Sequence, residues 1–462
     1  MKNLLEYTGI TIGLQALRSK FASHRGFRQI LSNIGWLLFD KALRVVVGLF
    51  VVAWVARHLG PDRFGMLNYV IAFVGLFMTL HKLGLDGIVV RDIVRSPDDA
   101  EELLGTAFAM KLAGGLLMVA LSVPIITIFR PDDPLVWTMA LVVALGFVFR
   151  SFESIELWFR SQVRSKSAVI AQSVAYLINS LFKIFLILAG AGVFFFAAAT
   201  FLEAILVAAG LVLAYRLTGR RMGRWRPRLD RGKTLLLESW PLIFSGFFVL
   251  IYLQVDQIML GQMMDDHAVG LYSAVVRISA FCYYIPMVIT WSVQPSIVSA
   301  REKDEKLYYS RLQDLFSLLT IGAYGIAIPV ALFSNEIIEL VFGAQYLNAA
   351  PVLVVHIFAA VFVFVGVARG LWVVTESFMT FNLFANVLAA FVNIALNLLF
   401  IDRYGILGAA YATLISYFIA YIGSSFLFAK TRKVFFMQMR SLLLLDTFRL
   451  LRRTPVKGSF EQ

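Results

Sequence analysis

Charged residues interrupt the first long apolar stretch of this chain, which runs from residue 34 to residue 56. Asp40, Lys41 and Arg44 all lie in the first half of that stretch. A charged side chain at the centre of a bilayer costs roughly 2.5–3.5 kcal/mol on insertion scales. We therefore expect these residues to face a polar partner or a water-filled cavity. Asp40 and Arg44 are four residues apart on one predicted helix, so they could pair directly.

Lysine and arginine recur inside the later apolar stretches. The basic residues predicted to lie within the membrane are Lys41, Arg44, Lys82, Lys111, Arg150, Lys183, Arg277 and Arg369. Lys82 and Arg369 lie near the ends of their stretches, where a long side chain can extend to the membrane surface. The others outnumber the acidic residues near them, so we expect a cationic cavity, with buried ion pairs as the alternative. Such a cavity would attract phosphate or pyrophosphate, which arginine can bind through two hydrogen bonds.

Two predicted helices carry stripes of amide side chains. Gln172, Asn179 and Lys183 are seven and four residues apart, which places them on one face of a helix. The same spacing relates three later residues, Asn386, Asn393 and Asn397. The stripes either line the cavity or bond neighbouring helices at about 0.6 kcal/mol per hydrogen bond. Lys183 favours the cavity, because a lone ammonium group needs water or an anion.

Three acidic residues in the apolar stretches, Asp40, Glu203 and Asp256, are candidates for ion or proton coupling. Burial disfavours the charged form of a carboxyl group, so such a group readily takes up a proton or a cation. A contact at a helix end is the alternative for Asp256. Six tryptophans near the ends of stretches are expected in the interfacial belt rather than in substrate binding. These are Trp36, Trp54, Trp158, Trp240, Trp291 and Trp372.

Apolar stretches of about 20 residues recur along the chain, which is 60% hydrophobic and 15% charged. This pattern predicts an all-α polytopic membrane protein with about 12 transmembrane helices. The predicted spans are 34–56, 64–85, 104–129, 135–158, 169–190, 193–215, 236–260, 268–291, 312–333, 350–373, 381–401 and 406–429. With both termini cytoplasmic, 30 Lys and Arg residues flank the spans inside and 4 outside, a strong positive-inside bias. The basic segment 216–233 is then a topology determinant, not a nucleic-acid site.

The second half of the chain repeats the first. Trp36 and Trp240 are 204 positions apart, and Gly65 and Gly270 are 205 apart. Six spans per repeat give both halves the same orientation, so we expect two pseudo-symmetric six-helix lobes around a central cavity. The predicted divisions are a cytoplasmic or interfacial segment 1–32, an N-lobe 33–215, a basic linker 216–235, a C-lobe 236–429 and a basic amphipathic tail 430–462. Asp40, Lys41 and Arg44 correspond to Phe244, Ser245 and Phe248, so the fold does not require the charges.

Catalytic signals are missing from the sequence. It has no P-loop and no nucleophile elbow, and its one cysteine, Cys282, lies inside a span. We therefore expect no enzyme activity, no catalytic residues, no bound metal and no cofactor.

Three segments resemble the bacterial O-antigen and exopolysaccharide repeat-unit flippases, which belong to the multidrug/oligosaccharidyl-lipid/polysaccharide exporter superfamily. The first is WLLFDKALRVVVGLFVVAWVARHLGPDRFGMLNYVIAFVGLF, followed by LGLDGIVVRD. The others are VDQIMLGQMMDDHAVGLYSAVVRI at 255–278 and YGILGAAYATLISY at 404–417. The resemblance covers about residues 30–430.

The resemblance implies movement of an undecaprenyl-pyrophosphate-linked oligosaccharide across the bacterial inner membrane by alternating access, with ion coupling. The pyrophosphate would meet Lys41, Arg44 and their cationic neighbours. Membrane lipid and, in the same pathway, a polymerase and a chain-length regulator are the implied partners. Two alternatives remain: a multidrug or cation extruder of the same superfamily, and a membrane polysaccharide polymerase or ligase.

Overall fold

The computed structural model describes residues 25–446, and every regular element in that part of the chain is a helix. The helices of the first lobe are α3 (Arg25–Leu76), α4 (Met78–Lys82), α5 (Leu85–Arg95), α6 (Ala100–Phe129), α7 (Pro134–Arg150), α8 (Ser154–Ser161), α9 (Lys166–Leu188) and α10 (Val193–Leu217). Those of the second lobe are α11 (Leu229–Met263), α12 (Asp266–Cys282), α13 (Tyr284–Lys303), α14 (Glu305–Leu332), α15 (Ser334–Phe342), α16 (Ala350–His356), α17 (Ala359–Thr375), α18 (Met379–Tyr404), α19 (Ile406–Phe418) and α20 (Ser424–Leu427). A last helix, α21 (Arg432–Leu442), packs against α14.

The predicted transmembrane architecture is confirmed. Nine helices in the described range are long and apolar enough to cross a membrane, and two bent pairs of helices raise the number to eleven. The two predicted spans 34–56 and 64–85 both fall within α3 and the bent segment that follows it. α3 runs through Gly60, whose φ of 73° and ψ of 168° break the helix between its two arms. Glycine adopts this backbone conformation without steric cost, and Pro61 then restarts the helix.

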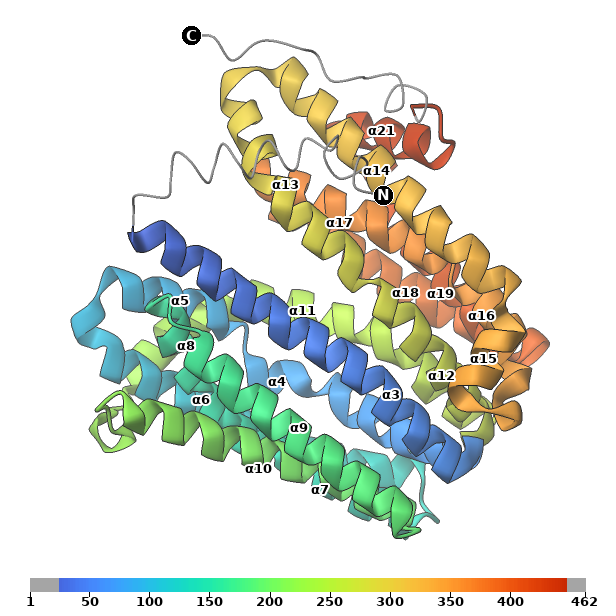
Figure 1. Ribbon diagram of the computed structural model, residues 1–462, viewed down its shortest axis with the longest axis horizontal. Helices are drawn as coiled ribbons and strands as arrows, with labels where there is room; N and C mark the ends of the chain where they lie inside the picture. The colour runs from blue at the N-terminus through green and yellow to red at the C-terminus, as the bar shows by residue number, and fades with distance from the viewer. Residues whose placement is uncertain (1–24, 447–462) are drawn as a thin grey trace, which may run out of the picture.

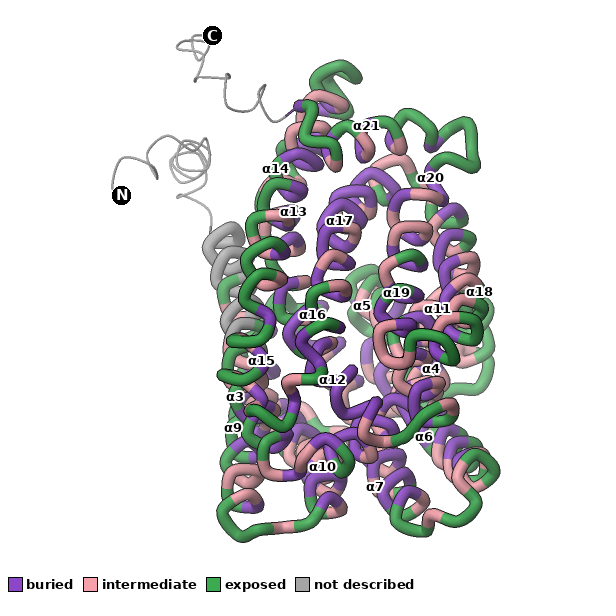
Figure 2. Tube along the Cα trace, turned by 90° about the vertical axis from the view of Figure 1, so that its right-hand side faces the viewer, coloured by how far each residue is buried: buried purple, intermediate pink, exposed green. Residues whose placement is uncertain are grey.

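The two lobes lie side by side and converge at one end (Figure 1), where the second arm of α3 packs along α12. Figure 2 shows α17 as largely buried, whereas α14 and α15 carry exposed residues along their outer faces. That distribution fits helices whose outer faces meet lipid and whose inner faces meet the other helices.

A close contact between the lobes joins residues that correspond in the two repeats. A Cβ atom built on Gly65 would lie 1.7 Å from the backbone oxygen of Asp266, and one on Gly270 would lie 2.0 Å from that of Pro61. Pro61 and Asp266, like Gly65 and Gly270, are 205 positions apart. The contact is therefore reciprocal, as expected across a pseudo-two-fold axis. We call this contact the junction.

Polar bonds across the lobes surround the junction. The Arg130 guanidinium donates to Asp266 at 2.8 Å and to the backbone oxygen of Gly261 at 2.7 Å. On the other side, the Arg57 guanidinium donates to backbone oxygens of α15, including that of Val341 at 3.0 Å. Because these oxygens end a helix, the positive charge also meets the negative end of the helix dipole. Hydrogen bonds between the lobes thus stabilise the glycine contact from both sides.

Arg369 corrects one sequence-based expectation. Its side chain does not extend to a membrane surface, because the residue is only 2% exposed within α17. The guanidinium donates to the backbone oxygen of Ala420 at 2.6 Å and to the Ser424 hydroxyl at 3.0 Å. Ala420 belongs to a π-helical segment, Ile419–Gly423, between α19 and α20. The arginine therefore binds a carbonyl at an irregular point of the last span.

Gly65→Ala should open the junction, because the added methyl group would overlap the backbone of α12. Asp62 and His267 lie across the junction, with their side-chain atoms 3.4 Å apart. Cysteines at these two positions, in a Cys282→Ser background, should form a disulfide in the parent and several-fold less of it in Gly65→Ala. Gly322→Ala is the control, since a Cβ there meets nothing within 4 Å. Equal disulfide yields in both alanine variants would show that the junction tolerates the methyl group.

Candidate functional site

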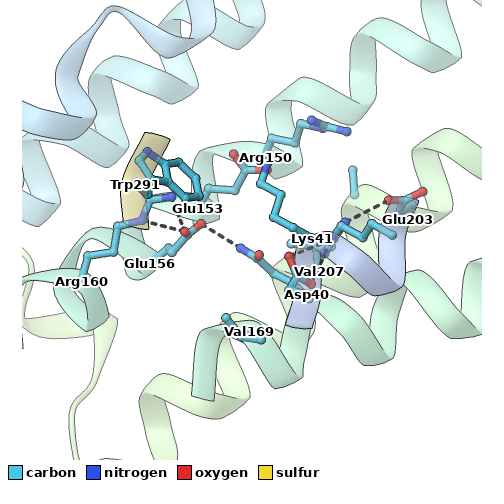
Figure 3. A pocket seen from close by; sticks show the side chains of 13 residues that line it. Asp40, Lys41, Arg150, Glu153, Glu156, Arg160, Val169, Glu203, Val207 and Trp291 are labelled. Carbon is cyan, nitrogen blue, oxygen red and sulfur yellow. Dashed lines mark hydrogen bonds and ion pairs between the residues drawn. The ribbon is translucent and has the colours of Figure 1, made fainter. Parts of the chain in front are cut away.

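A cavity of about 580 Å³ lies beside the first arm of α3 (Figure 3). Its walls come from the first lobe except for one tryptophan of the second lobe. The lining residues are Asp40, Lys41, Arg44, Arg150, Glu153, Glu156, Arg160, Val169, Gln172, Glu203, Ala204, Val207 and Trp291. Helices α3, α7, α8, α9, α10 and α13 therefore all contribute to this one space.

A second cavity of about 490 Å³ adjoins the first and shares Arg44, Arg150 and Glu203 with it. It extends between the lobes, since Lys183 of α9 and Arg277 of α12 both line it. We call the two spaces together the charged cavity. Five of the six cations predicted for the cavity lie here, namely Lys41, Arg44, Arg150, Lys183 and Arg277.

Ion pairs neutralise part of the charged cavity. The Arg44 Nε lies 3.0 Å from Asp40, as the four-residue spacing predicted, and another Arg44 nitrogen lies 4.0 Å from Glu203. Ser173 donates a further hydrogen bond of 2.7 Å to Asp40. Arg160 pairs with Glu156 through its Nε at 2.8 Å. These contacts hold the carboxylates of Asp40 and Glu156 in fixed positions.

Four cations of the charged cavity have no carboxylate within 4.0 Å in the part of the chain that the structure describes: Lys41, Arg150, Lys183 and Arg277. Lys41 and Arg150 lie over the rings of Tyr284 and Phe147 at 5.5 and 5.1 Å. Arg277 donates one long hydrogen bond, 3.4 Å, to the Asn68 side chain. A cation–π contact or a single neutral hydrogen bond offsets much less than a full ion pair does. The cavity therefore keeps an excess of positive charge that an anion could neutralise.

Lys111 is not among the residues that line the charged cavity, contrary to expectation. Its side chain is only 3% exposed, and its ammonium group lies 2.7 Å from Asp86. The pair joins α6 to the start of α5. Asp86 was visible in the sequence, but only the packing of these two helices brings it to Lys111.

The amide stripe of α9 divides between two carboxylates. Gln172 lines the charged cavity and donates a 2.8 Å hydrogen bond to Glu156. Asn179 is buried and donates a 2.7 Å hydrogen bond to Glu203. Both alternatives offered by the spacing are thus present, because each amide bonds another helical segment and one of them also faces the cavity.

The stripe of α18 does not line the charged cavity, because Asn386, Asn393 and Asn397 are all at most 5% exposed. Two of these amides surround Asp256 of α11, with Asn393 and Asn397 donating to its Oδ1 at 3.0 and 2.6 Å. The hydroxyls of Tyr272, at 2.6 Å, and of Thr413 donate to the other oxygen. Asp256 is therefore bound by four neutral donors and is not the simple helix-end contact considered as its alternative.

Asp256 also borders a cavity of about 260 Å³ in the second lobe, together with two of its donors, Tyr272 and Thr413. In the described part of the chain, no basic side chain forms an ion pair with Asp256. The Oδ1 atom of Asn397 is buried beside it without a hydrogen-bond partner. A carboxylate and an unpaired amide oxygen are the donor types that a hard cation or a proton prefers.

Three of the six tryptophans, Trp158, Trp291 and Trp372, depart from the expected interfacial belt. Trp158 and Trp372 are buried in the helix packing at 6% and 1% exposure. Trp291 is 50% exposed and lines the charged cavity. Sequence reasoning missed Trp291, Arg160 and Glu153 as cavity residues. The charges of Arg160 and Glu153 near a span end were the only available signal.

Two lobes of transmembrane helices with a charged cavity reaching between them define a two-lobed transporter architecture. Solved structures with the same fold include an inward-facing multidrug resistance MATE family transporter of the MOP superfamily, with a TM-score of 0.69 and 16% identity over 90% of this chain and 99% of that one. The lipid II flippase MurJ in an inward closed conformation also has a TM-score of 0.69, with 16% identity over 91% and 93% of the two chains. The chain belongs to the polysaccharide biosynthesis protein family, whose model matches residues 54–351.

Curated relatives agree with this family. A probable low-salt glycan biosynthesis flippase, Agl15 of Haloferax volcanii, is 23% identical over 79% of this chain and 76% of its own length. A probable flippase, AglR of the same organism, is 25% identical over 80% and 77%. The capsular polysaccharide biosynthesis protein CapF of Staphylococcus aureus is 21% identical over 41% of this chain and 48% of its own.

Charge removal should affect stability differently inside and outside the charged cavity. Asp86→Asn leaves the buried Lys111 ammonium without its partner, which we expect to cost roughly 3 kcal/mol and lower the apparent melting temperature of the purified protein by several degrees. Lys183→Met removes an unpartnered cation and should leave that temperature unchanged or raise it. Asp98→Asn, at an exposed residue, is the control. A loss in Lys183→Met as large as in Asp86→Asn would show that Lys183 is held by a stabilising partner.

Proposed function

We propose that this protein is a flippase that moves undecaprenyl-pyrophosphate-linked oligosaccharide repeat units from the cytoplasmic to the periplasmic leaflet for surface polysaccharide biosynthesis. The observation that carries the proposal is the set of cations without carboxylate partners in the charged cavity of a chain from this family. Leaving such charges unpaired at membrane depth is costly, so a role for them in binding an anion explains their presence.

Pyrophosphate matches the cavity in charge and in geometry. Arg277 comes from the second lobe, whereas Lys183, Arg150 and Arg44 come from the first. A planar guanidinium can bind two oxygens of one phosphate, while an ammonium group acts as a point charge. A headgroup between these residues would contact both lobes, and the polyprenyl tail would stay in the lipid.

Alternating access would follow from the arrangement of the lobes. Separating them at the junction requires breaking the bonds of Arg57 and Arg130, while the opposite end closes over the cavity. A substrate drives such a change only if it binds the two states with different affinity. Cations from both lobes provide such a difference, because their separation changes when the lobes move.

Asp256 is the proposed coupling site for a monovalent cation, either a proton or sodium. It lies in the second lobe, apart from the cations, so a coupling ion would not compete directly with the headgroup. Asp40 and Glu203 are weaker candidates, because Arg44 lies 3.0 and 4.0 Å from them. A carboxylate that already forms an ion pair with a side chain has a lower affinity for a free cation.

The positive-inside bias supports a location in the bacterial inner membrane with both termini cytoplasmic. The polymerase and chain-length regulator of the same pathway are the proposed partners. A multidrug or cation extruder would need an acidic cavity, so the cationic excess argues against that alternative. A polymerase or ligase is disfavoured because the loops at the junction end are short. Resistance to toxic organic cations conferred by this protein would favour the extruder.

Arg277→Ala should abolish surface glycan in cells that depend on this protein, because it removes the cation that the second lobe contributes to the headgroup site. Lipid-linked repeat units should accumulate, while the protein level in the membrane stays normal. Arg277→Lys should retain part of the activity, since it keeps the charge but loses the bidentate geometry. Arg164→Ala, at an exposed arginine, is the control. Normal glycan in Arg277→Ala, Arg44→Ala and the double variant would refute the cationic headgroup site.

Asp256→Asn should remove ion dependence from transport. In proteoliposomes, flipping of a lipid-linked oligosaccharide should respond to a pH or sodium gradient in the parent but to neither in the variant, because the neutral side chain cannot exchange charge. The two gradients, applied separately, identify the ion. Asp402→Asn, at an exposed carboxylate, is the control. A gradient response that persists in Asp256→Asn would assign the coupling to another residue.

A further inference from the structure

One end of the charged cavity carries an aromatic ring beside a group of hydrogen-bonding side chains. Figure 3 shows Trp291 beside Glu153, Glu156 and Arg160, at a distance from the group formed by Asp40, Lys41 and Glu203. The headgroup proposal gives no role to the tryptophan end. Its residues come from both lobes, since only Trp291 belongs to the second.

The side chains at this end form hydrogen bonds within the protein with only part of their donors and acceptors. Glu156 accepts from Arg160 at one oxygen and from Gln172 at the other, both at 2.8 Å, so its position is fixed. Glu153 has no ion pair or side-chain hydrogen bond in the described part of the chain. Its carboxylate therefore remains an acceptor for a donor in the cavity. Nitrogens of Arg160 and the side-chain oxygen of Gln172 supply further polar contacts.

The exposed ring of Trp291 is the second component of this end. Half of the residue is exposed, and it faces the cavity rather than being covered by other helices. A large exposed aromatic side chain among a few converging polar groups is typical of a small-molecule site. An indole offers a flat apolar surface of fixed geometry, and here it lines the same cavity as a carboxylate without a partner.

We propose that the tryptophan end of the charged cavity, formed by Trp291, Glu153, Glu156, Arg160 and Gln172, is a glycan subsite that binds one sugar ring of the oligosaccharide. A pyranose has an apolar C–H face, which suits the indole, and a rim of hydroxyls, which suits carboxylate, amide and guanidinium groups. This inference rests on the proposed function and adds a sugar-specific contact to it.

An organic cation would also suit an indole and a carboxylate. One of the two carboxylates at this end, Glu156, is already bound by Arg160. A neutral polyhydroxylated ring can use the arginine as a donor and the glutamate as an acceptor, whereas an organic cation offers the arginine no acceptor.

The subsite would also link sugar binding to the movement of the lobes. Trp291 lies on α13, whereas its polar partners lie on the segment from α7 to α9. A sugar between them contacts both lobes in this conformation. Rotation of the lobes about the junction would separate the ring from the polar groups, so the sugar would be bound in one state and released in the other.

The test uses purified full-length protein and two probes titrated separately by calorimetry. One is the oligosaccharide released by mild acid from the lipid-linked pool of the host, and the other is inorganic pyrophosphate. Trp291→Ala and Glu153→Gln should each weaken oligosaccharide binding at least tenfold and leave pyrophosphate binding unchanged. Trp291→Phe should retain most of it, because it keeps a flat ring. Trp240→Ala is the matched control, since Trp240 has a similar exposure of 54% but does not line the cavity.

The outcomes separate this inference from the proposed function. Arg277→Ala should weaken pyrophosphate binding and leave oligosaccharide binding unchanged. Unchanged pyrophosphate binding in this variant would count against the headgroup site alone. Unchanged oligosaccharide binding in Trp291→Ala and Glu153→Gln would overturn the glycan subsite. A third result is a parent that binds tetraphenylphosphonium but no oligosaccharide, with that binding abolished in both variants. This result would assign the tryptophan end to organic cations instead. If Trp291→Ala does not fold, Trp291→Leu removes the flat ring with a smaller loss of volume and gives the same reading.

Discussion

The cost of placing charge at membrane depth governs the organisation of this protein. Every cation within the spans needs a counter-charge, a carbonyl, an aromatic ring or a cavity, and the structure uses each of these solutions. Lys111 has Asp86, Arg369 has the carbonyl of Ala420, and Arg44 has Asp40. Lys183 and Arg277 face the charged cavity between the lobes, where Arg277 has one long hydrogen bond to Asn68. The cavity is therefore the part of the molecule where electrostatic stabilisation is incomplete and where an anion would complete it.

The two lobes share a fold but differ in charge. The first lobe gathers cations around α3 and α9, whereas the second buries Asp256 among neutral donors. Both lobes also pair an asparagine with a carboxylate, Asn179 with Glu203 and Asn393 with Asp256. The difference is that Arg44 lies near Glu203, while no basic residue pairs with Asp256 in the described chain. This single difference separates a lobe suited to an anion from one suited to a cation.

The sequence predicted the helical spans, the repeat and the Asp40–Arg44 pair, because these depend on composition, on spacing and on neighbours within one helix. It failed for Lys111 and left the role of the α18 asparagines open between two alternatives, because their partners lie on other helices. Helical periodicity shows which residues share a face, but it does not show what that face meets. Trp291 illustrates the same limit, because a tryptophan near a span end has the same sequence pattern whether it faces lipid or a cavity.

The reciprocal contact at the junction has a consequence for the origin of the chain. Gly65 approaches Asp266 and Gly270 approaches Pro61, which is the geometry of an isologous interface between two identical subunits. A six-helix ancestor with one such glycine could therefore have associated with a second copy of itself through this surface. Fusion of the two copies into one chain would preserve the contact and allow the two halves to diverge in sequence. The two halves now differ in charge, which two identical subunits could not do. The first half has Asp40, Lys41 and Arg44 where the second has Phe244, Ser245 and Phe248.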